Sequence, residues 1–206
     1  MTLPIGSDCL CGTPDIIATV RGVAATKGDA GESHTARLVL VPWTGEFNDA
    51  WVRILADPDV VRFISGGVPF TREEAIENSE RSAALWAEFG FGPWAAIDAG
   101  TDRWIGRIGL NLLDDWPGPD RWEVGWELDR EFWGRGLATE GGREAIDFGF
   151  SVAGLRKIIS VTRADHAASR RVMAKCGLQF QALVVYRGVG CAWYAIDHDD
   201  WRHRSS

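Results

Sequence analysis

The strongest constraint on the fold is a strand-like run that enters a glycine-containing turn and continues as a helix. Residues 122–128 (WEVGWEL) have strand character, residues 133–140 (WGRGLATE) form the turn, and the helical run ends near Val152. Glycine permits positive φ and a close approach of ligands to the backbone, and the first amides of a helix lack internal acceptors. The helix dipole adds roughly half a positive charge at that end. This arrangement is typical of a site that binds phosphate or pyrophosphate.

The spacing of the turn separates three kinds of phosphate site. A Walker turn requires a Lys-Ser or Lys-Thr pair, and the chain contains neither. The dinucleotide fingerprint Gly-x-Gly-x-x-Gly fits Gly134 and Gly136 but places its third glycine at Thr139. What remains is the pattern x-x-x-Gly-x-Ala, from Trp133 to Ala138. This octet alone leaves open a tight strand-to-helix turn without any ligand.

The remaining pattern resembles the acetyl-CoA pyrophosphate loop of the GCN5-related N-acetyltransferase (GNAT) family. Other segments are similar to successive strands and a helix of that family, in the same order: residues 35–43, 123–129, 157–162 and 167–178. The match runs from about Thr35 to Trp201 and resembles the RimJ/RimL-like branch, which acetylates ribosomal-protein N-termini. The resemblance implies an α/β GNAT fold, with a mixed, strongly twisted sheet of six to seven strands and helices on both faces.

The pattern along the chain predicts one domain preceded by an extension. Residues 1–32 are rich in Gly, Ala, Thr and Asp and are expected to be loosely ordered, with an added edge strand or a partner contact as the alternative. Residues 33–206 form the expected acetyltransferase domain, which is large enough to bury a core. Thr71 and Glu74 have capping-box spacing and predict a helix that reaches about Phe89. Further strands are expected at residues 94–97, 104–112, 180–185 and 190–196.

Composition excludes several classes of function. A net charge of −7 argues against a nucleic-acid surface and suits cationic acceptors such as amines. No apolar run reaches membrane-spanning length and residues 1–20 do not have the pattern of a signal peptide, so a cytoplasmic location without membrane attachment is expected. The cysteines and histidines show no metal-ligand grouping. Most of the eleven tryptophans are expected in the core.

Donor binding is assigned through the resemblance. It implies that acetyl-CoA is the co-substrate and that its pyrophosphate is bound by backbone amides of Gly134, Arg135, Gly136, Leu137, Ala138 and Thr139. The end of the preceding strand would pair with pantetheine through Trp126, Glu127 and Leu128. Arg135 adds charge for a phosphate or is simply a solvated loop arginine. His166 stands where the family has an asparagine, which puts one pantetheine contact in doubt.

Two residues are the catalytic candidates. Strand alternation places Glu123 on one face together with Gly125 and Glu127, and the resemblance implies that Glu123 lies near the acceptor amine. The alternative is a surface glutamate on a half-exposed strand. Met173 occupies the position of the family's tyrosine and cannot donate a proton. Ser169, earlier in the same helix, could donate a hydrogen bond to the thiolate, or is an ordinary helix serine.

The predicted function is therefore acetyl transfer to a primary amine by direct attack, with no metal and no covalent enzyme intermediate. A protein α-amine has a pKa near 8, so roughly a tenth is neutral at pH 7, against about 0.04% of a lysine side chain. This favours a protein N-terminus as acceptor, with a small molecule such as an aminoglycoside or a polyamine as the alternative. A non-catalytic acyl-CoA-binding module is the competing hypothesis, motivated by Met173 and His166. A homodimer is left open.

Overall fold

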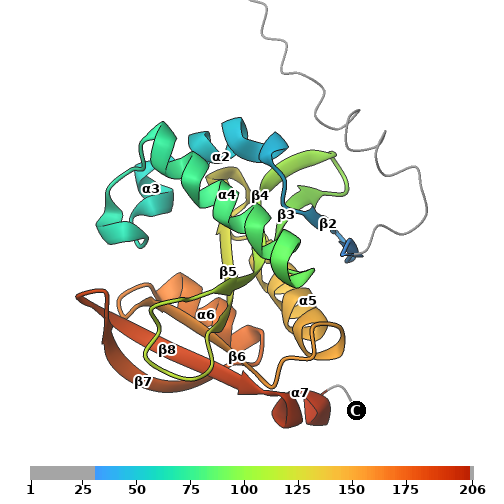
Figure 1. Cartoon of the computed structure of the whole chain (residues 1–206), viewed down its shortest axis with the longest axis vertical. Coiled ribbons are helices and arrows are strands. Elements are labelled where there is room, and N and C mark those ends of the chain that lie inside the picture. Colours follow the sequence, from blue (N-terminus) through green and yellow to red (C-terminus); the bar gives the residue numbers. More distant parts are fainter. Residues whose placement is uncertain (1–30, 205–206) are drawn as a thin grey trace, which may run out of the picture.

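The computed structural model describes residues 31–204, and a mixed sheet of eight strands runs through it (Figure 1). The predicted extension, residues 1–32, lies outside the described residues except for Gly31 and Glu32. The strands are β1 (Ser33–His34), β2 (Leu38–Pro42), β3 (Pro93–Asp98), β4 (Arg103–Leu112), β5 (Trp122–Leu128), β6 (Lys157–Arg163), β7 (Gln179–Tyr186) and β8 (Val189–Asp197). Their spatial order is β1-β2-β3-β4-β5-β6-β8-β7. The expected six to seven strands fall one short because the two-residue strand β1 has too little pattern to recognise.

Helices cover both faces of the sheet, as expected for this fold. They are α2 (Asn48–Leu55), α3 (Pro58–Val61), α4 (Arg72–Phe89), α5 (Leu137–Ser151), α6 (Ala167–Lys175) and α7 (His198–Arg204), with short 3-10 turns η1 (Gly45–Phe47), η2 (Ser65–Gly67) and η3 (Arg130–Phe132). Ala95 of β3 packs in a cluster with α2 and α4, whereas its neighbour Ala96 packs in the cluster that contains Ile146 of α5. Because successive strand residues point to opposite faces, these helices lie on opposite sides of the sheet. No helix among residues 31–204 is long and apolar enough to cross a membrane.

Local sequence signals explain where the main helices begin and how closely they pack. The Thr71 hydroxyl accepts from the Glu74 amide (3.2 Å) and the Thr71 amide donates to the Glu74 carboxylate (2.8 Å), which confirms the capping box at the start of α4. Gly141 of α5 faces Ile108 so closely that an added Cβ would lie 2.7 Å from its Cδ1 atom. Helix α5 can therefore lie directly on the sheet.

Most of the tryptophans lie in the core or pack against it, as expected. Trp43, Trp51, Trp94 and Trp116 are buried, and six others are half-buried. Trp43, Trp51 and Trp104 contact one another edge to face, and Phe47 stacks on Trp104. The exception is Trp133, which lies in the glycine-containing turn and is 47% exposed.

Among residues 31–204, β5 and β6 are the only parallel neighbours, and the sheet opens between them. Strands β4 and β5 pair along their length, from Gly106–Leu128 to Leu112–Trp122. In contrast, β5 and β6 share one register pair, Glu123–Ile159. Beside it the Ser160 hydroxyl donates to the Val124 carbonyl (2.8 Å). Beyond this pair, toward Leu128 of β5 and Arg163 of β6, the two strands diverge, and we call this region the split.

Candidate active site

The predicted anion-binding turn is present at the start of α5. Gly134 (φ 74°) and Gly136 (φ 81°) both adopt left-handed backbone, and Gly136 caps the helix without any side-chain hydrogen bond. Within the described residues, no acceptor is bonded to the amides of residues 134–138. The Thr139 amide, which was expected to contact pyrophosphate, donates to the Gly136 carbonyl (3.1 Å). The amides that remain for an anion are therefore those of the preceding five residues.

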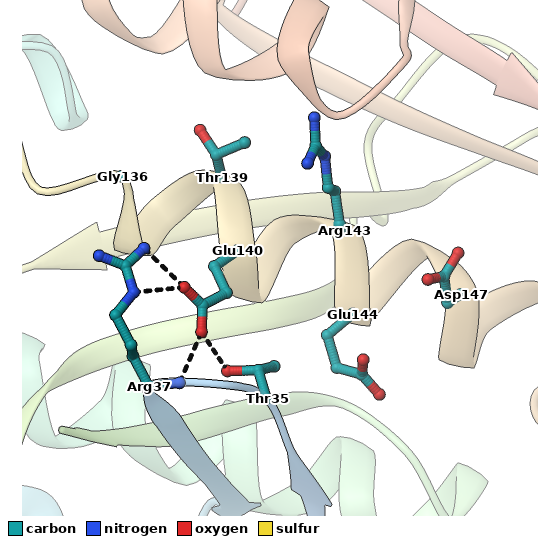
Figure 2. Close-up of a pocket in the computed structure, with 8 residues that line it drawn as sticks. All are labelled: Thr35, Arg37, Gly136, Thr139, Glu140, Arg143, Glu144 and Asp147. Carbon is teal, nitrogen blue, oxygen red and sulfur yellow. Dashed lines mark hydrogen bonds and ion pairs between the residues drawn. The ribbon is translucent and has the colours of Figure 1, made fainter. Parts of the chain in front are cut away.

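A buttress from the loop between β1 and β2 holds this turn in place. Figure 2 shows Thr35 and Arg37 pointing toward Glu140 of α5. The Glu140 carboxylate accepts from the Thr35 hydroxyl (2.6 Å), the Arg37 amide (2.8 Å) and Arg37 Nε (2.7 Å), while Arg37 Nη1 donates to the Arg135 carbonyl (2.8 Å). Burial acts to raise the pKa of Glu140, but these hydrogen bonds outweigh it and the pKa is lowered. The ionised Glu140 therefore links the turn to the loop that leads into β2.

The buttress borders an open hollow, whose lining is drawn in Figure 2: Thr35, Arg37, Gly136, Thr139, Glu140, Arg143, Glu144 and Asp147. Of these eight residues, sequence reasoning identified Gly136 and Thr139 but not the other six. The only local signal was an acidic residue, Glu140, in the first turn of a helix, where carboxylates are generally favourable. Nothing local indicated that Arg37, over a hundred residues earlier, would bind it.

Arg135 has a defined position at the turn. Its guanidinium lies over the Phe132 ring, 5.0 Å from the ring centroid, a distance at which cation–π attraction operates. The charge is therefore held next to the free amides. Both sequence interpretations, a phosphate ligand and a solvated arginine, remain compatible with this position.

The edge of β5 that faces the split carries unpaired backbone at Trp126. The Ser160 hydroxyl reaches the Val124 carbonyl from β6, and the Asp129 amide donates to Ile105 on the β4 side (2.8 Å). Backbone groups alternate in direction along a strand, so the N–H and C=O of Trp126 and Leu128 point into the split. The Leu128 carbonyl already accepts from the Trp133 indole (2.8 Å). Of the three residues expected to pair with pantetheine, Trp126 therefore offers both backbone groups.

Glu127, the third of those residues, is used differently. Its backbone faces β4, and its carboxylate accepts from Arg107 Nε (3.2 Å) and Nη2 (3.1 Å). Arg107 is only 6% exposed. It also donates to Asn78 (2.9 Å) and Ser82 (2.7 Å) of α4 and lies 4.4 Å from the Trp51 ring centroid. Sequence reasoning missed this network, because Arg107 was simply one charged residue inside an apolar strand.

Glu123 lies where β5 and β6 part. Its Oε1 atom accepts from the Val161 amide (2.9 Å), so the carboxylate occupies the position of the next strand partner of β6. Burial raises the pKa of Glu123 to about 7, assisted by Glu127 and opposed by the Val161 hydrogen bond and by Arg107 and Arg187. An ordinary surface glutamate would not show this shift. A carboxyl group with a near-neutral pKa, placed where the two strands begin to diverge, is suited to general base catalysis.

Ser169 and His166 lie at the start of α6, which follows β6. Ser169 is a buried residue, 8% exposed. Met173, one turn later, is 1% exposed in the main core and has no proton to donate. Because β5 and β6 are parallel, the loops that follow them leave the sheet at the same end, the carboxyl end of both strands. The glycine turn and the Ser169 end of α6 therefore flank the split.

An aromatic stack brings the segment that contains α3 and η2 to the same end of the sheet. The rings of Phe63 and His166 are nearly parallel (11°), with centroids 3.9 Å apart. Burial lowers the pKa of His166, with Asp165 opposing the shift, and so favours the neutral imidazole. The expected pantetheine contact of His166 remains a prediction. Phe63 was not identified from the sequence, where it belonged to an unassigned turn.

No metal centre accompanies these groups. Among residues 31–204, no cluster of three or more His, Cys, Asp or Glu side chains is arranged to hold a metal ion.

Comparison with known proteins gives the same picture as the geometry. A family model described as an acetyltransferase (GNAT) domain matches residues 37–179. FsC-acetyl coenzyme A-N(2)-transacetylase of Aspergillus fumigatus is 36% identical over 151 residues, which is 70% of this chain and 63% of that protein. This chain thus spans a little under two thirds of that relative. The uncharacterized N-acetyltransferase YoaA of Bacillus subtilis is 30% identical over 151 residues, 73% of this chain and 84% of that protein.

Solved structures share the fold at lower identity. An acetyltransferase from Agrobacterium tumefaciens has a TM-score of 0.72 at 23% identity, covering 83% of this chain and 96% of its own. The aminoglycoside acetyltransferase AAC(6')-Ib, in complex with coenzyme A and kanamycin, has a TM-score of 0.69 at 16% identity, covering 82% of this chain and 99% of its own.

Proposed function

This chain belongs to the GNAT family of acetyltransferases, and we propose that it transfers the acetyl group of acetyl-CoA to a primary amine by direct attack. The proposal rests on Glu123. Its carboxyl group is buried where β5 and β6 begin to diverge, and burial raises its pKa to about 7. Bound acetyl-CoA would supply the thioester that the amine attacks. The residues of the chain hold the donor, take a proton from the amine and stabilise the leaving thiolate.

The donor is held by backbone groups. The free amides of residues 134–138 at the positive end of α5 suit a pyrophosphate, and Arg135 adds charge beside them. The unpaired edge at Trp126 suits an extended, amide-bearing arm such as pantetheine. These two features fit the two chemical parts of acetyl-CoA, which is why it is the proposed donor.

The proton steps are divided between the two sides of the split. Glu123, ionised above its pKa of about 7, accepts a proton from the amine, directly or through water. Ser169 is the proposed hydrogen-bond donor to the thiolate, since it lies in the first turn of α6 and Met173 cannot serve. A base of this strength favours turnover over the non-catalytic alternative, because a binding module has no need of it.

The acceptor is the least constrained part of the proposal. A base with a pKa near 7 is well matched to an α-amine, of which roughly a tenth is neutral at pH 7. We therefore take a protein N-terminus as the first candidate, in keeping with a RimJ/RimL-like branch. A small-molecule amine is the second candidate, supported by the 36% identical relative, whose name describes an N(2)-transacetylase of FsC.

An amine panel tests the function. We expect purified protein to release coenzyme A from acetyl-CoA only when an amine is present, and faster with peptide α-amines than with lysine side chains at pH 7, because far more of the α-amine is neutral. Release with small-molecule amines alone would replace the first acceptor by the second. Tight acetyl-CoA binding without release on any amine would favour the binding module, and absence of binding would exclude the anion-site interpretation.

The glycine turn gives a separate prediction for donor binding. In Gly136→Ala the left-handed backbone costs about 1–2 kcal/mol, although an added Cβ would have room, with Arg37 Nη2 nearest at 3.6 Å. If the free turn relaxes, binding must restore it, so coenzyme A affinity should fall about 5- to 30-fold. Calorimetric titration measures this. Gly154→Ala is the matched control, because Gly154 (φ 66°) also has open space but lies beyond the other end of α5. Equal loss of affinity in both variants would exclude a specific role for the turn.

A further inference from the structure

The loop between β4 and β5, residues 113–121, packs on one face of strands β6, β7 and β8. Its Trp116 is 7% exposed and lies in one cluster with Ile159 of β6. The centroid of the Trp116 ring is 5.4 Å from that of Tyr186 and 5.5 Å from that of Trp193. Figure 1 shows this loop in yellow-green, passing over the β6–β8 part of the sheet. We call residues 113–121 the cover loop.

Glu123 lies on the face of the sheet that the cover loop covers. It is the register partner of Ile159, and paired residues of neighbouring strands place their side chains on the same face. The Glu123 carboxylate also accepts from the amide of Val161, whose side chain packs against the Trp116 cluster. The cover loop therefore shields the β6 side of Glu123 from water.

Asp115 fixes the cover loop to the turn between β7 and β8. Its two carboxylate oxygens accept from Arg187 Nε (2.8 Å) and Nη2 (2.9 Å), the two-pronged geometry of a specific guanidinium–carboxylate pair. The Tyr186 hydroxyl donates to the same carboxylate. The hydrogen bonds from Arg187 and Tyr186 lower the pKa of Asp115, so it is ionised at neutral pH. We call Asp115, Tyr186 and Arg187 the clasp.

The clasp lies close enough to Glu123 for their charges to interact. Burial raises the pKa of Glu123, and Arg187 is among the groups that oppose the shift. The hydrogen bond to Asp115 raises the pKa of Arg187, and Glu123 adds to that rise. The other groups that interact with Glu123 in this way come from β4, β5 and the β7–β8 hairpin: Arg107, Glu127, Tyr186 and Cys191. Because Asp115 and Arg187 carry opposite charges, the clasp acts on Glu123 mainly through the loop that it holds.

We propose that Asp115 is a positioning residue for the base: by binding Arg187 and Tyr186, it keeps the cover loop closed over the β6 side of Glu123. This inference rests on the proposed function, in which Glu123 is the base, although the shielding itself is a property of the free chain. With the clasp in place, Glu123 stays in the near-neutral range in which a general base is most effective. Without it, water reaches the carboxyl group and stabilises the ionised form.

Carbon-13 NMR titration of the Glu123 carboxyl group tests the proposal in the full chain without acetyl-CoA, and Glu123→Gln assigns the resonance. The double variant Asp115→Asn/Arg187→Gln removes the clasp without changing the net charge. We expect the pKa of Glu123 to fall from about 7 to about 6 or lower. The matched control Asp49→Asn/Arg72→Gln removes another exposed pair, between α2 and α4, and should leave this pKa unchanged.

The two single variants separate shielding from charge. Asp115→Asn removes a negative charge and Arg187→Gln removes a positive one, so charge alone would lower the pKa of Glu123 in the first and raise it in the second. Opening of the cover loop lowers the pKa in both, which is the expected result. Opposite shifts in the two single variants, or an unchanged pKa in the double variant, overturn the proposal.

Kinetics distinguish failure of this inference from failure of the proposed function. The rate of the double variant, divided by that of the same variant with Glu123→Gln, should level off at a lower pH than in the parent chain. An NMR shift that the rate does not follow leaves the shielding intact but excludes Glu123 as the base. Circular dichroism checks folding of the double variant. If it is unfolded, Tyr186→Phe, which removes one hydrogen bond of the clasp, replaces it. A smaller fall in the same pKa is then expected, and no fall overturns the proposal.

Discussion

Glu123→Gln is expected to lower kcat by about 10²- to 10⁴-fold, the range that removal of a general base produces. Glutamine keeps the shape of glutamate and can still accept from the Val161 amide, but it cannot take a proton. Coenzyme A affinity should stay unchanged, because the proposed donor contacts are backbone groups of other residues. Stopped-assay kinetics and calorimetry measure the two quantities. Glu88→Gln, at an exposed position near the end of α4, is the control.

The pH dependence makes this prediction specific. In the parent chain the rate should rise with pH through about 7, as Glu123 loses its proton. The neutral fraction of the acceptor amine also rises with pH, but equally in parent and variant. The ratio of their rates therefore isolates Glu123 and should level off above about pH 7. A ratio that is flat across this range, or a kcat close to that of the parent, would exclude Glu123 as the base.

The same shift has a consequence for stability. The pKa of Glu123 is raised in the folded state from an ordinary 4.5 to about 7. Its contribution to stability is therefore complete below about pH 4.5 and is lost as the pH rises through about 7. Relative to the parent, Glu123→Gln should become more stable between pH 5 and pH 8. Denaturant unfolding at the two pH values provides this readout independently of catalysis.

Arg107→Met is expected to lower the free energy of unfolding by about 3–5 kcal/mol, the usual cost of removing one partner of a buried ion pair. The substitution leaves the Glu127 carboxylate, which is only 18% exposed, without its cation. Ser82 loses the donation from Arg107 as well, and Asn78 keeps only the Trp51 indole as donor to its Oδ1 atom. Urea unfolding followed by tryptophan fluorescence measures the change.

A second arginine on the same strand is the control for this prediction. Arg103 binds Glu131 at 2.6 Å, but both side chains are more than half exposed, so Arg103→Met should cost about 0–1 kcal/mol. The double variant Arg107→Met/Glu127→Leu removes the orphaned charge and should recover part of the loss. If Arg107→Met costs no more than Arg103→Met, the buried network does not stabilise the fold.

Features set by neighbouring residues could be predicted from the sequence. The capping box of Thr71 and Glu74, the strand before the turn and the left-handed glycines at Gly134 and Gly136 all depend on residues a few positions apart. The GNAT fold followed from several such segments in order. The expected RimJ/RimL-like branch and the protein acceptor do not have this support and remain proposals.

Features set by distant contacts could not be predicted. Glu123 was identified as a candidate base, but its raised pKa comes from burial, and the Val161 amide of the next strand opposes that shift. Arg107 gains its role from Asn78 and Glu127, which come from a helix and a strand on either side of it in the sequence. Phe63 meets His166 across about a hundred residues. Local periodicity contains no information about these pairs.

The split between β5 and β6 also affects how the two ends of the molecule are coupled. Ladders of hydrogen bonds join neighbouring strands within β1–β5 and within β6–β8. A single register pair joins the first group to the second. A molecule with extended amides that lies along Trp126 would act as an added rung between them. Donor binding would therefore strengthen the connection between the two groups of strands. Binding and release of that donor would stiffen and loosen the junction between β5 and β6 on every catalytic cycle.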